Sequence, residues 1–199
     1  LVGGTGFVGR AIANRLVEAG VNIVVPTRHR SRAGHILLLP TVEVVDADVH
    51  DPATLERLFA GADAVVSLVG VLHSRSGEPY GPGFARAHVE LPKKIVAACR
   101  QAGVKRLVHI SALGASADGP SEYQRSKAAG EAAIRSTGAD LDWVILRRSV
   151  IFGRDDRFLN MFARLAAVFP VLPLAGADAR FQPVYVEDVA EVVWRSLIT

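Results

Sequence analysis

The sequence predicts an α/β fold, a doubly wound parallel sheet with helices on both faces. Apolar runs rich in Val and Ile alternate with segments whose apolar residues recur at helical spacing. This alternation builds a parallel sheet, because parallel neighbours need crossover helices, which then cover both faces. A chain of 199 residues is long enough to bury the core of one such domain.

The expected elements follow one another along the chain. Strands are expected at residues 1–2, 21–25, 42–45, 64–69, 104–110 and 143–146. Helical segments are expected at 8–19, 54–59, 84–102, 122–137 and 158–169, with a final apolar segment at 189–197. Between the last strand and that final segment we expect a polar loop at 147–157 and a stretch rich in Pro, Leu and Gly at 170–176.

Gly, Pro and Asp residues mark where the helices begin and end. Gly20 and Gly103 stand at C-cap positions, and Asp51 followed by Pro52 is typical of a helix start. Pro92 lies inside an otherwise helical stretch and is expected to kink it or to mark its true start.

Composition and charge exclude several classes of protein. Half of the residues are hydrophobic and 22% are charged, as in globular proteins. The single cysteine, Cys99, cannot form an internal disulfide, and no Cys/His cluster has metal-ligand spacing, so we expect no metal and a reducing, cytoplasmic location. No apolar run approaches the ~20 residues that span a bilayer, and a net charge of +3 is too small to indicate nucleic acid. The chain opens two residues before a glycine turn, so we expect its first strand to lack its beginning.

The glycine turn carries the first functional signal. It reads Gly3-Gly4-Thr5-Gly6-Phe7-Val8-Gly9 and lies between a strand and an amphipathic helix, the context of a dinucleotide-binding fingerprint. Glycines allow the turn and let a pyrophosphate approach bare backbone at the helix N-terminus. No Lys-Ser/Thr follows, which disfavours a P-loop; a plain structural turn is the alternative. We therefore predict a Rossmann-type domain over 1–147, with 148–199 as a partial substrate-side region continuous with it.

The end of the second strand indicates which cofactor is bound. An NAD site usually has Asp or Glu there, whereas this chain has Arg28 and Arg30, which suit a 2′-phosphate. NADP(H) is therefore favoured over NAD(H), with a solvated basic turn as the alternative. Asp48, followed by Val49 after the third strand, is placed to meet the adenine edge or to cap the next loop.

A tyrosine and a lysine carry the second functional signal. Tyr123 and Lys127 are four residues apart on a predicted helix, so they share one helical face. An ammonium near a phenol favours the phenolate and makes the tyrosine a usable acid/base. Ser111, at the end of the preceding strand, is placed to bind a substrate oxygen. The alternative is a surface tyrosine beside a solvated lysine.

Taken together, these motifs resemble the extended and atypical short-chain dehydrogenase/reductases of the epimerase/dehydratase superfamily. The similar stretches are the glycine turn and residues 64–70, 108–114, 123–127, 146–153 and 182–190. The last three are most similar to the branch that contains the nucleotide-binding accessory subunit of respiratory complex I and its bacterial relatives.

The resemblance implies roles for individual residues. Tyr123 is the catalytic acid/base, Lys127 holds the nicotinamide ribose, Ser111 orients the substrate, and Gly70 passes beside the cofactor. Two departures stand out. His88 replaces an Asn that many relatives carry in the fourth helix, where a packing or hydrogen-bonding role is favoured over catalysis. Arg147-Arg148 replaces a common Arg-Pro pair.

Three functions follow from these observations. The first is an NADP(H)-dependent oxidoreductase or epimerase/dehydratase acting on an unknown small molecule. The second, implied by the resemblance, is a non-catalytic NADPH-binding subunit associated with a respiratory complex, on the matrix side of the mitochondrial inner membrane. Nucleic-acid binding through the basic cluster at 28–32 is disfavoured, because the cluster is short and lacks interleaved aromatic residues. The resemblance also implies a homodimer through the helices at 84–102 and 122–137.

The cofactor assignment predicts the effect of Arg28→Asp. Because a carboxylate repels a 2′-phosphate, this substitution is expected to weaken NADPH binding while sparing NADH. Titration of both cofactors into the wild-type and variant proteins measures it. An unchanged NADPH affinity would show that the assignment is wrong.

Overall fold

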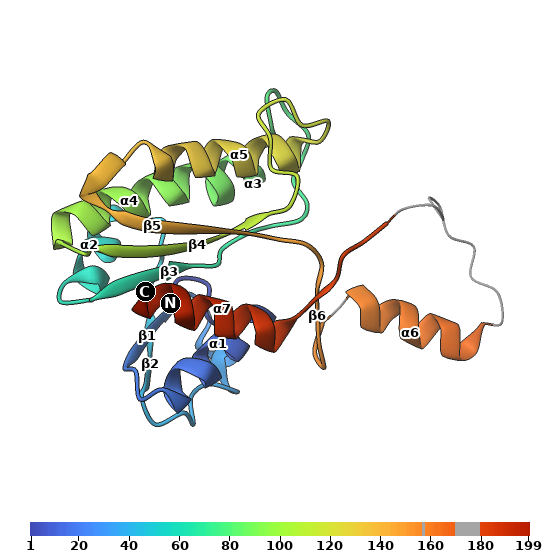
Figure 1. Ribbon diagram of the computed structural model, residues 1–199, viewed down its shortest axis with the longest axis horizontal. Helices are drawn as coiled ribbons and strands as arrows, with labels where there is room; N and C mark the ends of the chain where they lie inside the picture. The colour runs from blue at the N-terminus through green and yellow to red at the C-terminus, as the bar shows by residue number, and fades with distance from the viewer. Residues whose placement is uncertain (157, 170–179) are drawn as a thin grey trace.

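The computed structural model has helices packed on both faces of a parallel sheet (Figure 1), and it describes residues 1–156, 158–169 and 180–199. The strands are β1 (Ile23–Thr27), β2 (Val42–Asp46), β3 (Ala64–Ser67), β4 (Arg106–Ala112), β5 (Asp142–Arg148), β6 (Ile151–Phe152) and β7 (Val184–Tyr185). The helices are α1 (Phe7–Glu18), α2 (Pro52–Phe59), α3 (Pro82–Phe84), α4 (Leu91–Ala102), α5 (Glu122–Arg135), α6 (Phe158–Val168) and α7 (Val186–Ile198). Short 3₁₀ turns cover Arg30–Ala33 and Gly138–Asp140, and a π-helix covers Ala85–Glu90. The predicted stretch at 170–176 lies outside the described residues.

The first two residues join the two halves of the sheet. Val2 bridges in parallel to Ser67 of β3, and the amino group of Leu1 donates a 2.8 Å hydrogen bond to the carbonyl of Val24 in β1. With the parallel pairs β1–β2, β3–β4 and β4–β5, the order is β2, β1, the 1–2 segment, β3, β4, β5. This is the doubly wound order of a Rossmann fold, so the predicted fold class is confirmed.

Two apolar clusters hold the helices on the sheet. α1 and α7 cover one face, around core residues such as Ile12, Val108 and Val193, and α2, α4 and α5 cover the other, around Leu55, Leu107 and Ile134. Figure 1 shows these layers above and below the strands. α7 packs directly against α1, so the two ends of the chain share one face of the sheet.

Most predicted helix boundaries agree with the structure. Gly20 and Gly103 have positive φ at the ends of α1 and α4. Asp51 caps α2 by accepting a 3.0 Å hydrogen bond from the amide of Thr54, with Pro52 at the first helical position. β5 extends to Arg148, and β6 lies within the loop predicted at 147–157, because strand pairing continues past the apolar run.

The helix predicted at 84–102 is not one regular α-helix. It consists of α3, the π-helix and then α4, with Pro92 in the first turn of α4. Proline has no amide proton, so the carbonyl of His88 receives no hydrogen bond from position 92. Gly130 of α5 lies against that carbonyl, where a Cβ atom would overlap the oxygen.

This close approach predicts the sign of a substitution. Gly→Ala in an ordinary helix stabilises by about 1 kcal/mol. Gly130→Ala is instead expected to lower the free energy of unfolding by about 2 kcal/mol or more, because the methyl group meets backbone that cannot move alone. Urea denaturation measures the change, with Ala132→Gly on the exposed side of α5 as the propensity control. A stabilised Gly130→Ala protein would contradict the packing.

Candidate functional site

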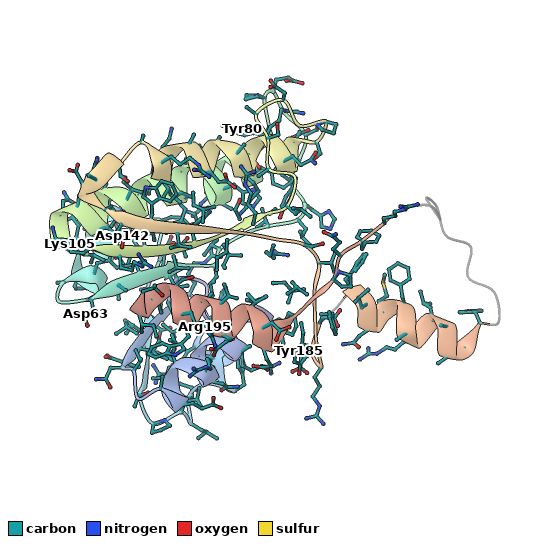
Figure 2. All side chains as sticks on the ribbon, viewed as in Figure 1. Asp63, Tyr80, Lys105, Asp142, Tyr185 and Arg195 are labelled. Carbon is teal, nitrogen blue, oxygen red and sulfur yellow. The ribbon has the colours of Figure 1, made fainter. Side chains whose placement is uncertain are left out.

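A cleft of about 640 Å³ lies where α1 begins. Thr5, Gly6 and Phe7 line it from the glycine turn, and Arg148, Val150 and Ile151 line it from the end of β5 and the chain that follows. Figure 2 labels Asp63, Lys105 and Asp142 at the opposite edge, where β3, β4 and β5 begin. The cleft is therefore at the carboxyl edge of the sheet, where open α/β sheets bind ligands.

The glycine turn is shaped for a close-approaching ligand. A Cβ atom on Gly9 would lie 2.5 Å from the Cα of Gly4, so this glycine lets α1 pack against the backbone of the turn. Gly6 is exposed, and a Cβ there would find no neighbour nearer than 3.7 Å within the described structure. Gly6 is also the N-cap of α1 and supplies no side-chain cap, which leaves the first amides of the helix for an anion. These features fit a dinucleotide pyrophosphate.

The two arginines after β1 have different surroundings. Arg28 follows Thr27, the last residue of the strand, and is exposed. Arg30 is tied back to β2, because its guanidinium donates a 2.8 Å hydrogen bond to the carbonyl of Val44. Arg28 is therefore the more available of the two for a 2′-phosphate.

The residues after β2 are held by local contacts. The carboxylate of Asp48 accepts a 3.0 Å hydrogen bond from the amide of His50, and the guanidinium of Arg86 lies 3.8 Å from it. Val49 packs against the core beside α2 and α4. Asp48 thus caps its own loop, one of the two roles that we expected, while about half of its side chain remains exposed.

Tyr123 and Lys127 lie one turn apart on α5, whose start is fixed by a capping box between Ser121 and Gln124. Lys127 is 4% exposed, and its ammonium donates a 2.9 Å hydrogen bond to the carbonyl of Ile110. Burial, with the nearby charge of Arg148, lowers the pKa of Lys127 to about 8. Lys127 therefore anchors α5 to the backbone of β4.

Ser111 lies in a buried polar network. Its fully buried hydroxyl donates a 2.5 Å hydrogen bond to Glu131. The Nε and Nη2 atoms of Arg147 donate hydrogen bonds of 2.9 and 2.7 Å to the same carboxylate. Burial raises the pKa of Glu131, but the hydrogen bonds from Arg147 and Ser111 outweigh it and hold that pKa below its usual range. The proton of this hydroxyl is thus engaged by Glu131, and the substrate contact of Ser111 stays a prediction. The sequence analysis did not single out Glu131. Its position four residues after Lys127, on the same face of α5, is the sequence signal that could have indicated its place in this network.

His88 connects the loop after β3 to the helix of Tyr123. Its Nε2 accepts a 3.0 Å hydrogen bond from the amide of Val71, so Nδ1 carries the proton and donates to Ser126 at 2.9 Å. The hydroxyl of Ser126 in turn donates a 2.8 Å hydrogen bond to the carbonyl of Tyr123. The Tyr123 ring lies edge-on to His88, with centroids 5.4 Å apart. Burial and the charge of Lys127 lower the pKa of His88 to about 4, and Gly70 lies beside the same ring. The favoured hydrogen-bonding role of His88 is observed.

His109 is a second buried histidine that the sequence analysis did not single out. It faces α5 from the middle of β4, is 2% exposed, and its Nδ1 has no hydrogen-bond partner among the described residues. Burial, then the charges of Lys127 and His88, lower its pKa to about 3. It packs as a neutral side chain.

The comparisons with known proteins agree with this geometry. Residues 3–160 match a family model described as NAD(P)H-binding. The chain belongs to this family, within the atypical short-chain dehydrogenase/reductases. The family assignment made from the motifs is therefore confirmed, as is NAD(P)H binding as the property of the domain.

Named relatives include respiratory subunits and a reductase. The chain is 35% identical to mitochondrial NADH dehydrogenase [ubiquinone] 1 alpha subcomplex subunit 9 of Mus musculus, over 95% of this chain and 50% of that protein. It is 34% identical to ceramide reductase of Caulobacter vibrioides, over 96% of this chain and 57% of that protein. This family member thus spans about half the length of these relatives.

A solved structure shares the fold. The dTDP-glucose 4,6-dehydratase DesIV of Streptomyces venezuelae, determined with NAD bound, has a TM-score of 0.79 and 24% identity, covering 96% of this chain and 68% of that chain. In the described residues of this family member, no helix is long and apolar enough to cross a membrane.

The two buried histidines predict opposite outcomes. His109 titrates near 6.5 when unfolded and near 3 when folded, so its contribution to stability is present above pH 6.5 and is lost as the pH falls toward 3. His109→Leu is expected to leave the free energy of unfolding near neutral pH unchanged or higher. Because leucine takes up no proton on unfolding, the variant is also expected to lose about 2 kcal/mol less than the wild type when the pH falls to about 5.

The measurement is urea unfolding of wild-type and variant proteins at both pH values. His88→Leu is the matched control, because it leaves the Val71 amide and Ser126 without their partner. It is expected to cost about 1–3 kcal/mol near neutral pH. Equal losses for the two variants would contradict the assigned environments.

Proposed function

We propose that this protein is an NADP(H)-dependent oxidoreductase in which Tyr123 transfers a proton to or from a carbonyl or alcohol oxygen. The observation that carries the proposal is the placement of Tyr123 and Lys127, one turn apart on α5, in a domain whose glycine turn leaves the α1 amides uncapped. A bound nicotinamide supplies or accepts the hydride.

The chain's own residues have separate tasks in this reaction. The amides at the start of α1 hold the pyrophosphate, and Arg28 binds the 2′-phosphate. When a carbonyl is reduced, the phenol of Tyr123 gives its proton to the oxygen as the carbon receives the hydride. Lys127 carries the positive charge that stabilises the phenolate left behind, and it holds the nicotinamide ribose.

The surroundings of the Tyr123 and Lys127 side chains favour this assignment over a solvated Tyr/Lys pair. Lys127 is buried and hydrogen-bonded, and the Tyr123 ring is held against His88 and Phe84. Burying an ammonium costs free energy, which a surface lysine avoids. A reductase among the relatives is consistent with the same chemistry.

This proposal predicts the effect of Tyr123→Phe. Removing the hydroxyl is expected to lower kcat by about 10²–10⁴-fold, because general acid–base catalysis contributes that much. The Kd for NADPH should stay within about twofold, since the phenol does not hold the phosphates. NADPH consumption with a panel of aldehydes and ketones, including ceramide-derived ones, gives kcat. Wild-type turnover that Tyr123→Phe leaves unchanged would refute the mechanism.

The second candidate is a non-catalytic NADPH-binding subunit of a respiratory complex. It is favoured by the 35% identity to the mouse subunit and would place the protein at the matrix side of the inner membrane or its bacterial equivalent. Co-purification with respiratory subunits, together with NADPH that stays bound and is not oxidised, would support it over the enzyme. A homodimer through α4 and α5 also stays a prediction.

A further inference from the structure

Arg147 and Arg148 point to opposite faces of the sheet. Successive side chains of a strand alternate between faces. Arg147 binds Glu131 on the α5 side, and Arg148 lines the cleft at the start of α1. Adjacent arginines at the end of β5 therefore have different surroundings, and only the second reaches the candidate site.

Among the described residues, no carboxylate forms an ion pair with Arg148. Arg10 pairs with Asp155, and Asp156 accepts a 2.6 Å hydrogen bond from the amide of Leu159 at the start of α6. Within the described ranges, the only hydrogen bond of the Arg148 guanidinium is a 3.4 Å contact with the carbonyl of Ser149, and its Nε is buried without a partner. A guanidinium has five donors in a planar fork, so most of its capacity is unused.

The environment of Arg148 favours an anion. Its charge is close enough to Lys127 to lower the pKa of that ammonium. Two nearby cations repel each other, and an unpaired buried donor is costly. A negatively charged group in the cleft would relieve both penalties at once.

We propose that Arg148 binds an oxoanion, a phosphate or carboxylate group, in the cleft between the glycine turn and the end of β5. The oxoanion has two sources, the diphosphate of the cofactor or an acidic group of the substrate. The inference rests on the proposed function only in bringing those two molecules to this cleft. Arg148 forms charge-assisted hydrogen bonds to the oxygens with the nitrogens that are now unpaired.

The test measures binding with and without cofactor. Inorganic phosphate and acetate are titrated by calorimetry into the protein alone and into its NADPH complex, and NADPH is titrated separately. Arg148→Gln is expected to weaken oxoanion binding about tenfold or more, because hydrogen bonds to charged groups are strong. Arg154→Gln is the control, since it removes the same charge from an exposed site near the cleft.

The pattern of losses identifies the source. If Arg148→Gln weakens NADPH about tenfold, and NADPH displaces phosphate from the wild type, the cofactor supplies the oxoanion. If NADPH binding is unchanged and phosphate or acetate binds the NADPH complex through Arg148, the substrate supplies it. Wild-type affinities in Arg148→Gln, or an equal loss in Arg154→Gln, would overturn the proposal.

Two further arms keep the test decisive. Arg148→Lys keeps the positive charge but not the fork, so weakened phosphate binding at an unchanged unfolding midpoint supports the proposal even if Arg148→Gln does not fold. Binding of phosphate to the cofactor-free protein does not depend on turnover. Phosphate binding through Arg148 in a protein with no reductase activity would contradict the proposed function and still support the oxoanion site.

Discussion

The candidate site depends on one constraint, the parallel pairing that brings the carboxyl ends of the strands to the same edge of the sheet. The 1–2 segment completes this pairing by joining β1 to β3. Because the strands from β1 to β5 then end on the same side, the glycine turn, His35 of the segment after β1, and the end of β5 line one cleft, although they are far apart in sequence. α1 can lie close to this edge because Gly9 and Gly4 allow backbone contact.

A second level of organisation lies between the sheet and α5, where polar groups are buried. Lys127, Glu131 and His88 each have specific partners on β4, β5 or the β3 loop. Satisfied buried polar groups fix the position of a helix more narrowly than apolar packing alone, because each wrong position leaves a donor or acceptor unpaired. The orientation of α5, and with it the place of Tyr123, follows from this network.

The two end-of-strand arginines show how position assigns chemistry. Arg147 neutralises Glu131, which needs a cation because it is buried. Arg148 differs from it by a single residue, yet it faces the other side of the sheet and a cleft that begins at an uncapped helix. The same residue type therefore stabilises a buried carboxylate at position 147 and is available to a ligand at position 148. Ser111, which the resemblance assigns to substrate contact, donates its hydrogen bond to the same buried carboxylate of Glu131.

The sequence by itself determined the fold class, most element boundaries and the glycine turn, because periodicity, capping residues and glycine spacing are local properties of the chain. It also indicated Tyr123 and Lys127, whose spacing on one helix requires no tertiary information. Only the tertiary structure decided that Ser111 and Arg147 converge on Glu131, that His88 is a neutral bridge, and that Arg148 reaches the cleft. It also decided the π-helix before Pro92, where Gly130 packs against the carbonyl of His88. These features join residues from separate elements, and a pattern along the chain cannot specify which side chains meet across a core.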